Sequence, residues 1–207
     1  DVFAKYPNVY VIADEIYEHI NSVGKHESIS QFEEISDRVV IINGVSKGYA
    51  MTGWRIGWID APQWLASACS SLQGQYTSGP SSISQKAAEA AYIGDQQCVE
   101  DMRVAFERRK NLIVSLLKEI PGITVNDPMG AFYIFPKVEG YLGKSFEGKQ
   151  INTAADLAMY LLETAHVACV GGDAFGAPDC IRFSFATSDD NIKRAIERVK
   201  EALSKLN

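Results

Sequence analysis

Asn43-Gly-Val-Ser-Lys-Gly-Tyr-Ala-Met-Thr-Gly-Trp-Arg-Ile-Gly57 is the stretch that decides how this chain is organised. It places one lysine and one arginine in an otherwise apolar turn that glycines interrupt. The runs Val39–Ile42 before it and Ile56–Ile59 after it are short and apolar, which predicts two fully buried strands. Lys47 and Arg55 therefore lie in a connection between two strands, where a functional site is a better explanation than a core.

Four glycines recur in this stretch, at positions 44, 48, 53 and 57. They allow sharp turns and a close approach of backbone amides to an anion. Ser46 adds a hydroxyl group, and Arg55 adds a planar fork suited to phosphate. Lys47 has two interpretations on this basis, a further phosphate contact or an amine nucleophile that forms a Schiff base with a carbonyl cofactor.

A second stretch, Asn8–Tyr17, is apolar up to Asp14 and then abruptly acidic. A carboxylate at the end of a buried strand is costly unless it meets a cation or a hydrogen-bond donor. The protonated ring nitrogen of pyridoxal phosphate is such a partner. Helix capping by Asp14 is the simpler alternative, but the position at the end of a strand favours the cofactor.

The combination of Asp14 with Tyr17, the pair Ser46-Lys47, and Arg55 eight residues after the lysine resembles the class I aminotransferases of the aspartate aminotransferase family. The resemblance implies that the protein uses pyridoxal 5′-phosphate as its cofactor; no metal is expected. Lys47 would be catalytic and carry the cofactor as a Schiff base, and Asp14 would pair with the ring nitrogen. Tyr17 would donate to the phenolic oxygen of the ring, while Ser46 and Arg55 would hold the phosphate.

The likeness covers nearly the whole chain, including Met129–Tyr133 and Ile181–Ser188, which resemble the substrate elements of the family's small domain. It implies that Arg182 binds the α-carboxylate of the substrate. Without the resemblance, an arginine on the polar face of a strand is as often simply exposed. Gly44 is a departure, because many family members have a second serine there.

The implied fold class is α/β, namely the C-terminal part of a fold type I pyridoxal-phosphate-dependent transferase. Residues 1–100 would form the C-terminal part of the large cofactor-binding domain, with a partial and mainly parallel sheet. Residues 101–207 would form the small α+β C-terminal domain. About half of a family member is missing, including its glycine-rich phosphate loop, so we expect this chain alone to be an inactive fragment that binds the cofactor weakly.

The implied activity is transfer of an amino group between an amino acid, with aspartate leading by resemblance, and a 2-oxo acid. Two alternatives remain open from the residues. The same groups could serve another pyridoxal phosphate reaction, such as a lyase or synthase reaction, or the chain could be an aminotransferase-like module that senses a ligand without turnover. The resemblance also implies a homodimer at full length.

Composition restricts the remaining classes of function. The net charge is −6, the isoelectric point is near 5.1 and basic residues are scattered, so neither nucleic acid nor an anionic membrane is an expected partner. Cysteines and histidines show no metal-ligand spacing, and a cytoplasmic protein with reduced thiols is the simplest expectation. The three tryptophans are expected in the core or an interface.

Periodicity predicts the remaining elements. Helices are expected from Pro62 until a break at Gly74–Pro80, from Ser81 or Ser82, from Asp95 to Pro121, over 153–166 and at the C-terminus. Strands are expected at 123–126, 131–135, 167–170 and 181–185. Alternation along the last strand places Ile181, Phe183 and Phe185 on one face and Arg182 on the other. The last helix has a buried stripe of Ile192, Ile196, Val199, Leu203 and Leu206.

Overall fold

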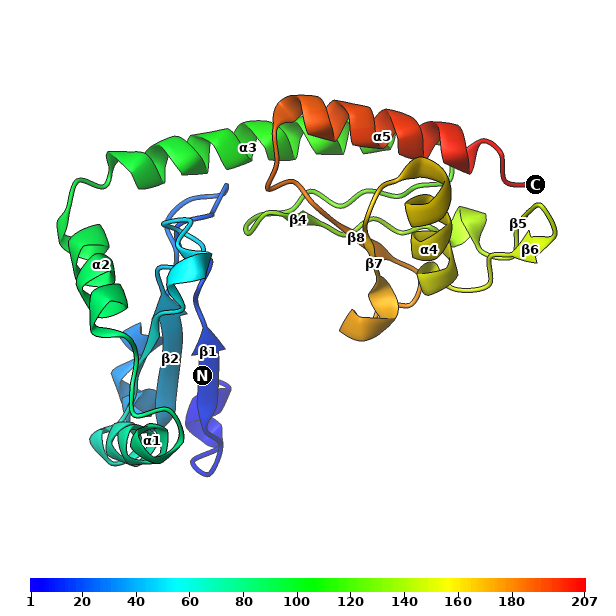
Figure 1. Cartoon of the computed structure of the whole chain (residues 1–207). Helices are drawn as coiled ribbons and strands as arrows, with labels where there is room; N and C mark the ends of the chain where they lie inside the picture. Colours follow the sequence, from blue (N-terminus) through cyan, green and yellow to red (C-terminus); the bar gives the residue numbers. More distant parts are fainter. The chain divides into compact units, whose positions relative to one another are not determined.

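The computed structural model describes residues 1–207, which divide into two compact units, Asp1–Arg103 and Val104–Asn207 (Figure 1). Both units contain helices and a sheet, as the α/β class requires. The assignment of residues 1–100 to a large domain and 101–207 to a small domain of the family stays a prediction.

The first unit contains a three-stranded sheet in the order β1-β2-β3, formed by β1 Val11–Asp14, β2 Val39–Gly44 and β3 Gly57–Asp60. β1 and β2 are parallel, and their register pairs Asp14 with Ile42. β2 and β3 are antiparallel, and their register pairs Gly44 with Gly57. The strands that flank the Lys47 turn are thus hydrogen-bonded neighbours, which brings the two ends of the turn together.

The expectation of two fully buried strands is wrong for Ile56–Ile59 and for Ile42. Val39 to Ile41 of β2 are buried, but Ile42 is 38% exposed and every residue of β3 is exposed. The reason is that β3 lies at the edge of the sheet, and an open hollow of about 630 Å³ separates Ile42, Trp58 and Ile59 from helix α1. The tryptophans are not core residues either, since Trp54, Trp58 and Trp64 are 45%, 41% and 58% exposed.

The helices of the first unit are α1 Gln63–Tyr76, α2 Ser82–Ile93 and the beginning of α3 Gln97–Lys118. Pro62 is the N-cap of α1 and Ser81 that of α2, as expected. The break expected at Gly74–Pro80 is confirmed, since α1 ends at Tyr76 and α2 begins at Ser82; Gly74 itself is still helical, because a single glycine is tolerated within a helix. Short 3₁₀ helices complete the unit at Phe3–Lys5, Ile29–Gln31, Glu33–Arg38 and Thr52–Trp54.

The second unit has a three-stranded antiparallel sheet in the order β4-β8-β7, with β4 Tyr133–Ile134, β7 Val170–Gly171 and β8 Ile181–Ser184. A hairpin, β5 Ser145–Phe146 and β6 Lys149–Gln150, follows β4. The helices are the rest of α3, α4 Ala154–Ala165 and α5 Asp189–Leu203, with 3₁₀ turns η5 Glu139–Tyr141 and η6 Gly172–Phe175.

Three expected strands are shorter in the structure. The strand expected at 123–126 is only an isolated bridge between Thr124 and Lys137. The strand expected at 131–135 is limited to two residues, because Ala131 has a left-handed backbone with φ 57°. The strand expected at 167–170 begins only at Val170, since the N–H of Val167 still bonds to a carbonyl of α4.

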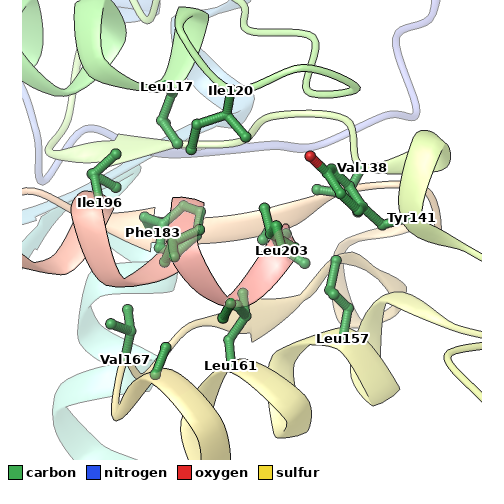
Figure 2. Packing of buried hydrophobic residues seen from close by; sticks show 14 of the residues in the cluster. Leu117, Ile120, Val138, Tyr141, Leu157, Leu161, Val167, Phe183, Ile196 and Leu203 are labelled. Atoms are coloured by element: carbon green, nitrogen blue, oxygen red, sulfur yellow. The ribbon is translucent and has the colours of Figure 1, made fainter. Parts of the chain in front are cut away.

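One large hydrophobic cluster holds the second unit together, and Figure 2 shows its side chains from α3, α4, α5 and β8 meeting around a common centre. The expected stripe of α5 is buried, and so are Ile181, Phe183 and Phe185 of the β8 segment. Each fully buried aliphatic or aromatic side chain stabilises the fold by roughly 1.5–3 kcal/mol. The smaller cluster in the first unit contains only Ile35, Val39 and Ile41 as buried members.

Candidate functional site

Five of the six predicted site residues lie at one edge of the β1-β2-β3 sheet. Asp14 is the last residue of β1 and pairs with Ile42, so Tyr17 and Lys47 follow strands that end at the same edge. Gly44 pairs with Gly57, and Ser46 and Arg55 each lie two residues beyond this pair. The sheet register thus collects an acid, a phenol, an amine, a hydroxyl and a guanidinium at one end.

Lys47 occupies a closed turn directly after β2. The N–H of Met51 donates to the carbonyl of Val45 at 3.3 Å, and the N–H of Ala50 donates to the carbonyl of Lys47 at 3.1 Å. The side chain is half-buried, and its Nζ lies 5.9 Å from the centre of the Tyr17 ring, within the range of a cation–π contact. The geometry therefore brings together Lys47 and Tyr17, which the sequence analysis predicted for the same cofactor.

The Lys47 turn rests against the segment that follows β1. A Cβ atom at Gly48 would lie 2.5 Å from Cδ2 of His19, so this glycine lets the turn pack on the imidazole. The His19 ring in turn meets the Tyr49 ring edge to face, with 5.4 Å between centres. The absence of a side chain at Gly48 thus fixes how closely Lys47 approaches the turn after β1.

A buried amide joins the same two segments. Asn43 is 4% exposed, its Nδ2 donates to Oε1 of Glu18 at 2.9 Å, and its Oδ1 accepts from the N–H of Gly44 at 2.7 Å. A buried amide with both ends hydrogen-bonded fixes the orientation of its neighbours. The sequence does not predict a role for Glu18, because its partner Asn43 lies 25 residues away and no local pattern links the two.

Arg55 is held in an unusual backbone conformation at the end of the turn. Its φ of 52° and ψ of 51° are left-handed, which costs a non-glycine residue free energy and is concentrated at functional sites. Its Nη1 donates to the carbonyl of Thr52 at 2.8 Å, and the side chain is otherwise exposed. The guanidinium therefore keeps donors for an anion at the edge where Ser46 also lies.

Gly44, the departure from the family pattern, has a structural cause in this chain. A Cβ atom there would lie 2.9 Å from the Cα of Gly57 and 3.0 Å from the carbonyl oxygen of Ile56, and both contacts are with backbone. A serine at this position therefore requires the two strands to move apart. A phosphate group at this end of the sheet would therefore find donors in Ser46, Arg55 and backbone amides rather than at position 44.

Asp14 is exposed at the strand end, and its Oδ1 accepts from the N–H of Ile16 at 3.2 Å. This local bond orients the carboxylate and leaves oxygen lone pairs for a further donor. A ring nitrogen that carries a proton is such a donor. The acid, the phenol, the amine, the hydroxyl and the guanidinium at this end of the sheet are the types of group that pyridoxal phosphate requires.

Arg182 belongs to the second unit and lies on the polar side of β8, as the alternation predicted. Its guanidinium carbon lies 4.4 Å from the centre of the Tyr133 ring and 4.3 Å from the centre of the Phe175 ring. The sequence around Arg182 predicts neither aromatic partner, because neither ring belongs to the β8 segment.

No group of histidine, cysteine and acidic side chains in the structure has the arrangement of a metal site. The four cysteines are free thiols, and His26 lies 3.0 Å from the buried carboxylate of Glu15. None of the helices combines the length and the apolar character that a membrane span requires.

Comparison with known proteins agrees with the fold. Residues 1–199 match the sequence model of the family described as aminotransferase class I and II, so the chain belongs to this family. Its fold is that of the pyridoxal-phosphate-dependent aminotransferases of fold type I.

Individual relatives within this family include aspartate aminotransferases. The chain is 43% identical over 210 residues to the aspartate aminotransferase of Rhizobium meliloti strain 1021, covering 100% of this chain and 51% of that protein. It is 44% identical over 209 residues to a bifunctional aspartate and glutamate/aspartate-prephenate aminotransferase of Petunia hybrida, covering 98% and 43%. The chain therefore spans about half the length of the curated relatives it matches.

Solved structures give the same result. The crystal structure of the aspartate aminotransferase from Rhizobium meliloti superposes with a TM-score of 0.94 at 42% identity, covering all of this chain and 52% of that one. The aromatic aminotransferase from Pyrococcus horikoshii superposes with a TM-score of 0.87 at 34% identity, covering 98% and 54%.

Proposed function

We propose that a protein carrying this chain at the full length of its relatives exchanges an amino group between an amino acid and a 2-oxo acid, using pyridoxal 5′-phosphate. The observation that carries the proposal is the sheet edge that collects Asp14, Tyr17, Ser46, Lys47 and Arg55, in a chain that belongs to the class I and II aminotransferases. When bound, the cofactor supplies an electron sink for the electrons left at the substrate α-carbon.

Each proposed site residue has a charge or a hydrogen-bonding group that suits one part of the cofactor. Asp14 offers a negative charge that favours a protonated ring nitrogen, because an opposite charge nearby stabilises a cation. Arg55 and Ser46 donate to the phosphate, and Tyr17 donates to the phenolic oxygen of the ring. Lys47 would attach the cofactor through its amine, and the same amine would move the proton at the substrate α-carbon.

Arg182 binds the α-carboxylate of the substrate in this proposal. A planar guanidinium donates two parallel hydrogen bonds to a carboxylate, and this fixes the orientation of the bonds at the α-carbon. Orientation decides which bond breaks. Proton removal rather than decarboxylation is therefore the expected outcome when Arg182 holds the carboxylate.

Aspartate with 2-oxoglutarate is the proposed substrate pair, since several relatives with more than 40% identity are named aspartate aminotransferases. We further propose a cytoplasmic homodimer. Free thiols are consistent with a reducing compartment. Ile12 of the first unit, 69% exposed, provides apolar surface for association, whereas Trp58 and Ile59 line the hollow beside α1.

The test measures transfer and attachment separately in the full-length protein. With pyridoxal phosphate, aspartate and 2-oxoglutarate, we expect oxaloacetate and glutamate to form in equal amounts, and Lys47→Ala to abolish their formation. Borohydride reduction followed by peptide mass spectrometry should locate the cofactor on the peptide that contains Lys47. Release of ammonia and pyruvate from serine, without a 2-oxo acid, would instead support a lyase.

The alternative of a ligand-sensing module without turnover predicts a different experimental result. A ligand-sensing module would bind the cofactor and amino acids without forming a 2-oxo acid from any of them. The chain of residues 1–207 by itself provides the comparison, because we expect it to bind the cofactor weakly and to show no turnover.

A further inference from the structure

The Arg182 guanidinium is enclosed by two aromatic rings, one on each of two neighbouring segments. Its central carbon lies 4.4 Å from the centre of the Tyr133 ring and 4.3 Å from the centre of the Phe175 ring. Both distances are well inside the roughly 6 Å limit of a cation–π contact. Two such contacts on one arginine restrict its side chain far more than either would alone.

Backbone pairing explains how Tyr133 reaches Arg182. The β4 and β8 strands pair Tyr133 with Ser184, and Arg182 lies two residues before Ser184 on the same face of β8. Tyr133 and Arg182 are therefore diagonal neighbours across the strands, a separation that a tyrosine and an arginine can bridge. This contact is built into the sheet register.

Phe175 comes from the η6 turn, and two features hold it in place. Its ring meets the Phe135 ring edge to face at 5.8 Å between centres. The turn itself is tightly closed, because the N–H of Gly172 donates to the carbonyl of Cys180 at 2.8 Å and the N–H of Ala177 donates to the carbonyl of Gly172 at 3.0 Å. These contacts hold the Phe175 ring beside Arg182, although the Phe175 side chain is 48% exposed.

The rings leave the donor-bearing part of the guanidinium for a ligand. Aromatic rings contact the faces of a guanidinium, while its N–H groups point outward in the plane. No carboxylate of the chain forms an ion pair with Arg182, and no hydrogen bond of the chain uses its N–H groups. A half-buried guanidinium that lies within 4.4 Å of two ring centres, and whose donors the chain leaves unused, suits a planar anion that accepts two hydrogen bonds.

We propose that Tyr133 and Phe175 are positioning residues that hold Arg182 as a preorganised receptor for a single carboxylate group. The inference rests on the proposed function for the identity of the natural ligand, but carboxylate binding itself needs neither the cofactor nor turnover. Preorganisation raises affinity because the side chain loses little rotamer freedom when the carboxylate binds. The rings act through Arg182 and form no bond with the reacting atoms.

The experiment follows the Arg182 Nε–Hε signal of the ¹⁵N-labelled chain by NMR during titration with propionate. Propionamide serves as the uncharged control, and Arg182→Lys assigns the signal. We expect propionate, and not propionamide, to shift the signal of the wild-type chain. Tyr133→Leu and Phe175→Leu should each weaken propionate binding by about fivefold, in keeping with the loss of one cation–π contact.

Matched variants separate positioning from folding. Tyr133→Phe and Phe175→Tyr keep the aromatic faces and should bind propionate as the wild type does. Tyr76→Leu removes an exposed ring of α1 that contacts no arginine, and should also leave binding unchanged. Thermal unfolding of every variant shows whether a leucine variant has lost its fold. In that case Phe175→Met, which removes a ring that is 48% exposed, carries the comparison with Phe175→Tyr.

In the full-length protein, the leucine variants should raise KM for the amino acid by about fivefold with a smaller change in kcat. Unchanged propionate binding in both leucine variants, or no propionate binding by the wild type, would overturn the inference even if amino transfer occurs. Conversely, propionate binding that depends on both rings, in a protein that transfers no amino group, would retain the inference and reject the proposed function.

Discussion

A single methyl group is enough to disrupt the η6 turn that carries Phe175. A Cβ atom at Gly172 would lie 1.9 Å from the carbonyl oxygen of Ala177 and 2.6 Å from that of Cys180. Both oxygens belong to backbone and cannot rotate away, so Gly172→Ala forces the turn open. We expect a loss of about 2–3 kcal/mol in the free energy of unfolding, measured by urea titration.

Gly74→Ala is the matched control for Gly172→Ala. Gly74 lies inside α1, has no atom within 4 Å of the added Cβ and does not have a left-handed backbone. Alanine should therefore stabilise the helix by about 0.5–1 kcal/mol. Equal effects of the two substitutions would show that the close contacts at Gly172 relax without cost.

The four thiols should differ in reactivity according to burial. Burial raises the pKa of the Cys169 thiol to about 11, and burial, followed by the neighbouring Asp179, raises that of Cys180. Only about one Cys169 side chain in a thousand is then the reactive thiolate at pH 8. At this pH, a thiol reagent with mass-spectrometric readout should label exposed Cys69 and Cys98 first.

Urea provides the control for the labelling experiment. Unfolding removes the burial of Cys169 and Cys180, so all four cysteines should react at similar rates in concentrated denaturant. Rapid labelling of Cys169 in the native chain at pH 8 would contradict the burial described here. Raising the pH toward 11 should speed labelling of Cys169, because its thiolate fraction rises.

At the scale of the element, the helix α4 depends on a reciprocal cap at its beginning. The Thr153 side chain accepts from the N–H of Asp156 at 3.1 Å, and the Asp156 carboxylate accepts from the N–H of Thr153 at 2.9 Å. Thr153→Ala removes the first of these bonds. We expect it to reduce the free energy of unfolding by about 1 kcal/mol at pH 7.

The same cap gives a defined pH dependence. Hydrogen bonds with the Thr153 side chain, then with the backbone N–H groups of Thr153 and Asn152, hold the pKa of Asp156 below its ordinary value. The stabilisation is therefore complete above the unfolded pKa of about 3.9 and is lost as the pH falls through the lower folded value. Asp156→Asn should be less stable than the wild type at pH 7, and the difference should shrink below about pH 4 in thermal unfolding.

A difference between Asp156→Asn and the wild type that stays constant down to pH 3 would assign the effect to something other than the charge. The sign is fixed by the direction of the pKa shift. Since the folded state binds its proton less tightly than the unfolded state, protonation in acid favours unfolding.

The sequence predicted best those elements whose apolar faces are covered by other parts of this same chain. The stripe of α5 and the alternation along β8 are local periodic patterns, and the large cluster of the second unit covers both. Ile56–Ile59 has an equally apolar pattern, but β3 is an exposed edge strand. Composition alone cannot tell a strand that the chain covers from one that it leaves exposed.

At the scale of the whole molecule, the candidate site also combines features that the local sequence predicts with contacts that it does not predict. Lys47 and Arg55 could be singled out from the sequence because one short stretch contains both and strand register brings its ends together. Asn43 with Glu18, and Arg182 with its two rings, could not, because their partners come from segments far apart in the sequence. Local spacing identified the chemical groups, and non-local packing supplied the side chains that orient them.

The two units should differ in how strongly they resist local opening. The second unit has a large buried cluster, whereas α1 has no buried residue and β3 is exposed along its whole length. Few buried apolar contacts mean low local stability. Hydrogen exchange of residues 1–207, followed by mass spectrometry, should therefore be slow in peptides of α4, β8 and α5 and fast in those of β3 and α1.

The protein at the full length of its relatives supplies the decisive comparison for the first unit. The chain spans about half that length, and Ile42, Trp58 and Ile59 beside the hollow are exposed in it. If further chain covers this surface, exchange in peptides of β3 and α1 should slow by at least about tenfold, while peptides of α4 and α5 change little. Equal protection in both proteins would mean that the additional chain does not stabilise the first unit. Weak cofactor binding by residues 1–207 would then result from missing side chains rather than from opening of the sheet.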